Sequence, residues 1–217
     1  AVRRQSGDVS VLDADGTGQK MPLGLNEIVL DASSKGLIAG SDAEKIELVA
    51  QAKGARLGMW SGKLNSQLRR DGVHWTWDSE MPLSGDLHVQ MNELQWLASQ
   101  VSSELVSKGQ LKMDAEFSGK FSRPKYQAKI EGHGLEFAFA TEGLLFPNGE
   151  LKAVLTDEIF KLEQLRFTNT LTFVPKIERL QDLNWAGRVG EFDASGEVNW
   201  RLQQGAIVAN WKNFPLL

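Results

Sequence analysis

One short segment near the start of the chain has part of the spacing of a calcium-binding loop. In "DADGTG", the residues Asp13, Asp15, Thr17 and Gly18 occupy the first, third, fifth and sixth positions of that motif. The twelfth position should supply a bidentate glutamate, but Gly24 stands there, and no helices are expected on either side. We therefore interpret the segment as a polar turn.

The other residues that could do chemistry are scattered. His74, His88 and His133 are the only histidines, and their spacing does not suit a metal site, so we expect them on polar strand faces or in turns, exposed to solvent. Ser118 and Ser195 lie outside the G-x-S-x-G context of a nucleophilic serine. The sequence thus favours a protein that is not an enzyme and needs no cofactor or metal, with a hydrolase as the least favoured alternative.

The composition of the chain limits which classes of partner it could bind. The chain has 217 residues, a net charge of -4 and no cysteine, which argues against nucleic-acid binding and excludes a disulfide framework. Seven Trp and ten Phe accompany a single Tyr, so the aromatic content is unusually apolar. Such aromatics suit a buried surface or an apolar binding surface better than a hydrogen-bonding cleft.

The dominant pattern is an alternation of apolar and polar residues, which predicts short strands joined by tight turns. In "LKMDAEF", Leu111, Met113 and Phe117 alternate with charged residues. The pattern recurs in "IELVAQA", "GDLHVQM", "YQAKI", "LEFAF", "ELKAVL" and "FDASGEVNW". Within "PNGE", Asn148 and Gly149 both tolerate a positive φ, so we expect a hairpin turn there.

One segment has a helical pattern instead. The stretch "NELQWLASQVSSELVSKG" places apolar residues at helical spacing, with Asn92 positioned to cap the first turn. These apolar residues are Leu94, Leu97, Val101 and Leu105. The sequence predicts one short amphipathic helix near residues 93–107 that plugs or flanks the sheet.

A sheet with one apolar face and one charged face must close on itself, curl, or hold something apolar. A closed β-sandwich is the ordinary solution, but these strands follow one another through short turns without long crossings. We expect one continuous segment over residues 1–217, with a possible subdivision into 1–91 and 92–217.

The order of these elements resembles the TamB family, the translocation and assembly module subunit of Gram-negative envelopes, within the AsmA-like group. The resemblance is strongest over residues 80–211 and is carried by three stretches in order. They are "MPLSGDLHVQMNELQWLASQV", "GQLKMDAEFSGKFSRPKYQAKIEGHGLEFAFATEGLLFPNGELKAVLTDEIFKLEQLRF" and "GEFDASGEVNW".

The resemblance implies an all-β fold of the β-taco type, an elongated and curved sheet with an open groove lined by apolar side chains. It also implies a periplasmic segment of a longer protein, tethered to the inner membrane through an N-terminal anchor that this chain does not contain. The family is associated with phospholipid transport between the inner and outer membranes and with outer-membrane protein assembly. Its partners would be phospholipid acyl chains and, through the full-length protein, a TamA-like outer-membrane protein of the Omp85 type.

Together, the alternation and the resemblance predict a lipid groove. We expect the following side chains to line it: Leu111, Met113, Phe117, Tyr126, Ile130, Leu135, Phe137, Phe139, Leu151, Leu155, Phe192 and Trp200. Which face of each strand lines the groove stays open, because register is not visible in a sequence. Two alternatives remain: a chaperone-like module that pairs its sheet edges with outer-membrane protein strands, and a closed structural or carbohydrate-binding β-sandwich.

Overall fold

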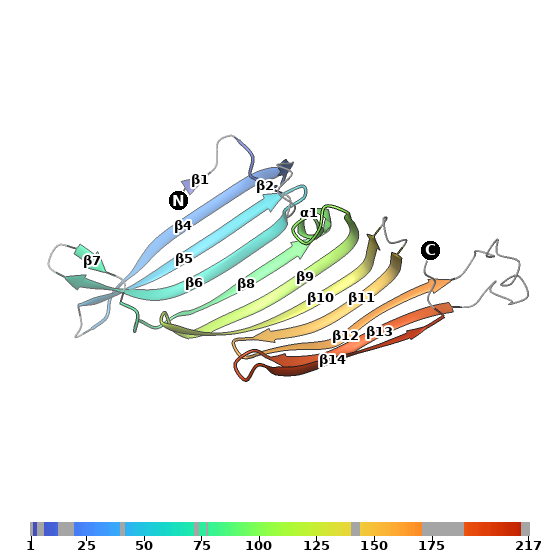
Figure 1. Cartoon of the computed structure of the whole chain (residues 1–217). Helices are drawn as coiled ribbons and strands as arrows, with labels where there is room; N and C mark the ends of the chain where they lie inside the picture. The colour runs from blue at the N-terminus through green and yellow to red at the C-terminus, as the bar shows by residue number, and fades with distance from the viewer. Residues whose placement is uncertain are drawn as a thin grey trace, which may run out of the picture.

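Ten long antiparallel strands form most of the molecule and lie side by side in one continuous, curved sheet (Figure 1). The computed structural model describes residues 2–3, 7–12, 20–39, 42–71, 74–76, 78–139, 144–170 and 189–213. The long strands are β4 (Leu25–Leu37), β5 (Ala43–Gly54), β6 (Gly58–Asp71), β8 (Ser84–Met91), β9 (Leu105–Lys120), β10 (Arg123–Phe139), β11 (Leu144–Thr156), β12 (Ile159–Thr170), β13 (Val189–Asn199) and β14 (Gln204–Lys212).

The long strands follow a meander, in which each pairs with the next long strand along the chain. Two short strands, β1 (Val2–Arg3) and β7 (His74–Thr76), add to β4 and β6, while β2 (Ser10–Leu12) and β3 (Lys20–Pro22) form a separate small sheet. The large sheet does not close, because β4 and β14 stand near its opposite ends (Figure 1). This confirms the expected all-β, open and elongated architecture, and the closed β-sandwich alternative is wrong.

The predicted alternation sorts side chains onto two faces of the sheet. One row of directly paired residues runs across all ten long strands and is entirely apolar or glycine. It consists of Leu30, Ala50, Gly62, Leu87, Ala115, Ala128, Leu155, Phe160, Val198 and Gly205. We call this side the apolar face. The neighbouring row, which includes Asp31, Lys63, Asp86 and Glu116, points to the opposite, polar face.

The predicted helix is present but much shorter than expected. Helix α1 spans only Gln95–Ala98, and β9 already begins at Leu105, so the range 93–107 is wrong at its C-terminal end. Val101 was expected on the buried helical face, yet it is 73% exposed. Leu105 and Ser107 are buried on β9, where Leu105 pairs with Phe139. Long-range strand pairing has therefore overridden the helical spacing.

The side chain of Gln95 explains how helix and strand coexist. Strand β9 extends past the end of β8, whose last pair is Met91 with Leu111. There the Gln95 amide donates to the Leu105 carbonyl at 3.0 Å and accepts from the Ser107 N–H at 2.8 Å. The side chain thus takes the place of a neighbouring strand and attaches α1 to the edge of β9.

The expected hairpin turn at Asn148–Gly149 is also wrong. Both residues lie inside β11, where Asn148 has a φ of 53° and the register with β10 shifts on either side of the pair between Leu135 and Gly149. The connection between β10 and β11 falls in residues 140–143, outside the described residues. A positive φ suits a bulge as well as a turn, and here it makes a bulge.

Candidate functional site

Two adjoining cavities lie on the apolar face over the N-terminal half of the sheet. The first has a volume of about 570 Å³, and Leu48, Leu64 and Phe117 contribute to its lining. The second has a volume of about 360 Å³ and is bounded by Trp60 and Trp96. Their linings share residues from four successive long strands, so the two cavities form one hollow, which we call the groove. The shared residues are Leu30, Ala50, Gly62 and Leu87.

Glycine residues lie in and beside the floor of the groove. Gly85 lies directly between Leu64 and Phe117 in one row of the apolar face. A Cβ on Gly85 would lie 2.2 Å from the Lys63 carbonyl oxygen, so close strand packing requires glycine at this position. Leu64 and Phe117 both line the first cavity. Gly62, between Ala50 and Leu87 one row away, lines both cavities and leaves its position in the floor without a side chain.

The groove is elongated across the strands. Its lining runs from β4 through β5, β6 and β8 to β9, and four inter-strand spacings of about 4.8 Å give a length of roughly 19 Å. One leaflet of a bilayer has a hydrocarbon thickness of about 15 Å, half of the full core. The groove therefore has room for an extended apolar chain of membrane-lipid length.

The polar residues next to the groove contribute little to its surface. Asp31, Lys63 and Asp86 border the first cavity, but their register places their side chains on the polar face. At the other end, the Trp60 indole donates to the Leu57 carbonyl at 2.8 Å. The groove therefore offers a ligand apolar contact and few polar anchors.

Helix α1 closes one side of the second cavity with Trp96. The indole Nε1 of Trp96 is buried without a hydrogen-bond partner, and so is the Ser107 hydroxyl on β9, the only such side-chain atoms among the described residues. Gln95, which attaches α1 to β9, directly precedes Trp96 in the chain. The contact between helix α1 and strand β9 thus buries two polar side-chain atoms that make no hydrogen bond.

The C-terminal half of the apolar face is filled by its own side chains. Phe146 makes edge contacts with Phe167, Phe192 and Trp211 at ring-centroid distances of 5.5, 5.6 and 5.6 Å. Phe137 adds an edge contact to Phe167 at 5.8 Å. These aromatic rings interlock and leave less open space than the small residues over β4 to β8.

The residues predicted to line a groove occupy several different environments. Phe117 lines the first cavity. Six others lie on the apolar face by register, toward the middle of the sheet: Leu111, Met113, Tyr126, Ile130, Leu151 and Leu155. Three belong to the filled half, where Leu135 is fully buried and Phe137 and Phe192 join the aromatic contacts. Phe139 pairs with Leu105 near the end of β10.

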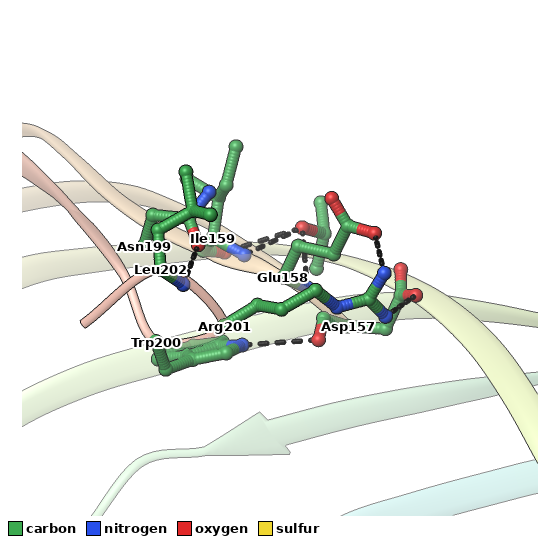
Figure 2. A network of polar contacts seen from close by, with 8 residues as sticks. Asp157, Glu158, Ile159, Asn199, Trp200, Arg201 and Leu202 are labelled. Atoms are coloured by element: carbon green, nitrogen blue, oxygen red, sulfur yellow. Dashed lines mark hydrogen bonds and ion pairs between the residues drawn. The ribbon is translucent and has the colours of Figure 1, made fainter. Parts of the chain in front are cut away.

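Trp200 is placed apart from the rest of the predicted lining. It lies in the turn after β13, is 40% exposed, and its indole donates to the Asp157 carbonyl at 3.0 Å (Figure 2). Conversely, several residues that line the groove were not among the predicted lining: Leu30, Leu48, Ala50, Trp60, Leu64, Leu87 and Trp96. The alternation in β5 and β8 marks Leu48 and Leu87 as face residues, but no signal in the sequence marks the hollow.

Charged pairs tie the strands together on the polar face. Glu47 lies between Lys35 and Lys63, and hydrogen bonds from these two lysines hold the pKa of its carboxyl below the usual range. Asp114 accepts from Lys112 and His88, at 2.7 Å in each case, which lowers the pKa of its carboxyl in the same way. These contacts lie on the polar face, and all of them except that between Lys112 and Asp114, which both belong to β9, join neighbouring strands, which indicates a structural role.

The candidate metal ligands do not converge in the described part of the chain. His74, His88 and His133 are all exposed, and His133 lies 2.6 Å from Glu150. No group of three or more His, Cys, Asp or Glu side chains that could hold a metal ion occurs among the described residues. The calcium-like segment at residues 13–18 lies outside them.

The fold and the groove define an all-β protein whose open sheet has a hollowed apolar face. Comparisons with protein-family models, curated proteins and solved structures find no match to this chain. Among the described residues, no helix has the length and apolar character needed to cross a bilayer.

Proposed function

We propose that this chain is a periplasmic segment of a TamB-like protein, whose groove carries the acyl chains of phospholipids in transit between the inner and outer membranes. The observation that supports this most directly is the hollow on the apolar face, formed by adjoining cavities of about 570 and 360 Å³. Its length of roughly 19 Å suits an extended acyl chain.

The physical basis of binding would be the hydrophobic effect. Each methylene removed from water contributes about 0.8 kcal/mol, so a chain of about sixteen methylenes gains on the order of 10 kcal/mol at full burial. Because the groove has few polar anchors, this energy depends little on the exact position of the chain. The total binding energy of a lipid would therefore be large, yet the lipid could still move along the sheet in small steps.

The cellular setting of the proposal rests on the family resemblance. It includes the N-terminal inner-membrane anchor, the TamA-like Omp85 partner and a contribution to outer-membrane protein assembly. The open groove is compatible with all three of these features. The only ligand that the proposal assigns to the groove itself is the acyl chain.

Native mass spectrometry of the chain purified from bacterial envelopes tests the proposal. We expect phospholipid masses on the wild type and their loss in Leu64→Asp, which places a charge in the first cavity. The matched control is Gln90→Asp, an exposed position on the polar face opposite Lys112. A wild type without lipid, or a folded Leu64→Asp variant with undiminished lipid, would contradict the proposal.

A further inference from the structure

A third cavity lies beside the groove, at the end of the sheet where β5 turns into β6. It has a volume of about 370 Å³ and is lined by residues of α1, of β3 and of the turn at residues 55–57. Arg56 and Gln95 line this cavity, whereas their neighbours in the chain, Leu57 and Trp96, line the second cavity of the groove. The two cavities therefore meet at these residues, and we call the third one the rim pocket.

Hydrogen bonds hold the walls of the rim pocket together. The Arg56 Nη1 donates to the Pro22 carbonyl at 3.0 Å, which joins the turn to β3. Just after α1, the Gln100 side chain donates to the Leu12 carbonyl of β2 at 2.7 Å, and Gln95 attaches the helix to β9. Figure 1 shows β2 and α1 at the same end of the long strands. The rim pocket is thus built by specific contacts between the elements that surround it.

Unlike the groove, the rim pocket is lined by charges of both signs. Lys20 and Arg56 supply two cations, Glu93 supplies one carboxylate, and Ser99 adds a hydroxyl group. The pocket therefore places polar anchors next to a groove that has few of its own. A ligand that matches it carries an anionic group for the two cations and a cationic group for the carboxylate.

The contact between Arg56 and Glu93 leaves room for such a ligand. The Arg56 Nε lies 3.4 Å from the Glu93 carboxylate, which is longer than the roughly 2.7–2.9 Å of a close charge-assisted hydrogen bond. The two side chains are 40% and 46% exposed, and an exposed ion pair of this kind contributes little to stability. The Arg56 contacts use Nε and Nη1, so its Nη2 stays available to a ligand.

We propose that the rim pocket binds the head group of a phospholipid whose acyl chain lies in the groove, with a preference for a phosphodiester that carries a primary ammonium group. The phosphate oxygens would accept hydrogen bonds from Arg56 and Lys20, and the ammonium group would donate to Glu93. A zwitterionic head group can replace the contact between Arg56 and Glu93 without leaving either charge uncompensated.

This inference rests on the proposed function, because the acyl chain of the same lipid must lie in the groove. It adds a polar site and a head-group selectivity that the groove alone does not provide. The glycerol part of the lipid would cross from one cavity to the other at Leu57 and Trp96. The rim pocket would therefore be the place where a lipid that moves along the apolar face is held by its head group.

Two lipids with the same fluorescent acyl chain separate binding in the rim pocket from binding in the groove. Phosphatidylethanolamine has the proposed head group, whereas diacylglycerol has none. We expect the wild type to bind phosphatidylethanolamine about tenfold more tightly, and Arg56→Gln to lose most of this difference. The matched control is Arg166→Gln, which removes an ion-paired arginine of the polar face whose side chain is 44% exposed, and it should keep the difference.

Glu93→Gln tests the charge preference, because it should change two affinities in opposite directions. The substitution removes the partner of the ammonium group, so the affinity for phosphatidylethanolamine should fall about fivefold. It also removes a repulsive charge, so the affinity for phosphatidylglycerol, which has the phosphate but no ammonium group, should rise. Circular dichroism checks that each variant folds. Lys20→Gln, at an exposed position, repeats the Arg56→Gln comparison without removing the bond to Pro22.

The possible failures of the pocket and of the groove are distinguishable. Equal affinity of the wild type for phosphatidylethanolamine and diacylglycerol would overturn the rim pocket and leave the groove in place, since both lipids still bind. Full selectivity in both folded variants, Arg56→Gln and Lys20→Gln, would do the same. A parallel change of both phospholipids in Glu93→Gln would overturn the ammonium contact. A wild type that binds neither phosphatidylethanolamine nor diacylglycerol would contradict the proposed function itself.

Discussion

Gly149 and Phe167 are in direct contact across the sheet: a Cβ on Gly149 would lie 2.3 Å from Cε1 of the Phe167 ring. Phe167 is 2% exposed and packs with Leu135 in the core of the filled half. The bulge in β11 and the aromatic core therefore depend on each other, because the bulge places Gly149, which has no side chain, against the Phe167 ring.

This contact predicts that Gly149→Ala destabilises the fold. The added methyl would overlap backbone-anchored neighbours, including the Leu135 Cβ at 2.8 Å, so the ring and the strand must shift. We expect a loss of about 1–3 kcal/mol in the free energy of unfolding, measured by urea denaturation. Ser195→Ala, at an exposed position on β13, is the control and should change it by less than about 0.5 kcal/mol. Equal stability of the two variants would disprove the contact.

Trp60 and Trp96 both line the second cavity, so the effects of replacing them on stability can be compared directly. Trp60 donates a hydrogen bond to Leu57, whereas the Trp96 Nε1 has no partner. Replacing either by phenylalanine removes similar ring atoms, but only Trp60→Phe removes a hydrogen bond and leaves a carbonyl without its donor. We expect Trp60→Phe to be less stable than Trp96→Phe by about 1 kcal/mol in thermal or urea unfolding. The reverse order would show that Trp96 has an important partner.

Filling the groove should weaken acyl binding without harming the fold. Ala50 is exposed in the floor shared by both cavities, so Ala50→Phe occupies space that a ligand would use. Exclusion of about two methylenes lowers affinity roughly tenfold. Titration with a fluorescent fatty acid measures this, with Gln90→Phe on the polar face as the control. Unchanged affinity in Ala50→Phe would place the ligand elsewhere.

The polar face should contribute to stability in a pH-dependent way. Lys112 and His88 hold the pKa of the Asp114 carboxyl below its usual range, so the contribution is present above the unfolded pKa, near pH 4, and is lost as the pH falls through the folded pKa. In Asp114→Asn the fall in stability between pH 5 and pH 3 should be shallower than in the wild type, by a small amount because the pair is exposed. Urea midpoints at several pH values measure the slope. Identical slopes would mean that the contact contributes nothing.

The faces of the sheet were predictable from the sequence because alternation is a local property. Leu111, Met113 and Phe117 lie on the apolar face as their spacing requires. The local helical signal at Leu94 and Leu97 was correct for one turn only, because pairing between Leu105 and Phe139 decides where β9 begins.

The position of the groove could not be predicted in the same way. Gly85 falls between Leu64 and Phe117, which line the first cavity, and Gly62 falls between Ala50 and Leu87 in the floor that both cavities share. Each of these relationships joins three strands, so it depends on registers that the sequence does not state. Of the predicted lining, Phe117 borders the first cavity, whereas Phe137 and Phe192 belong to the aromatic contacts of the filled half.

The most direct test of the groove is site-specific photo-cross-linking to phospholipid. A photoreactive amino acid at Leu64 or Leu48 would project into the first cavity, whereas the same residue at Gln90 would project from the polar face. With the protein isolated from envelopes, we predict phospholipid adducts from Leu64 and Leu48 and none above background from Gln90. Equal labelling from both faces, or no adducts from either cavity position in folded protein, would contradict the central claim that acyl chains bind in this groove.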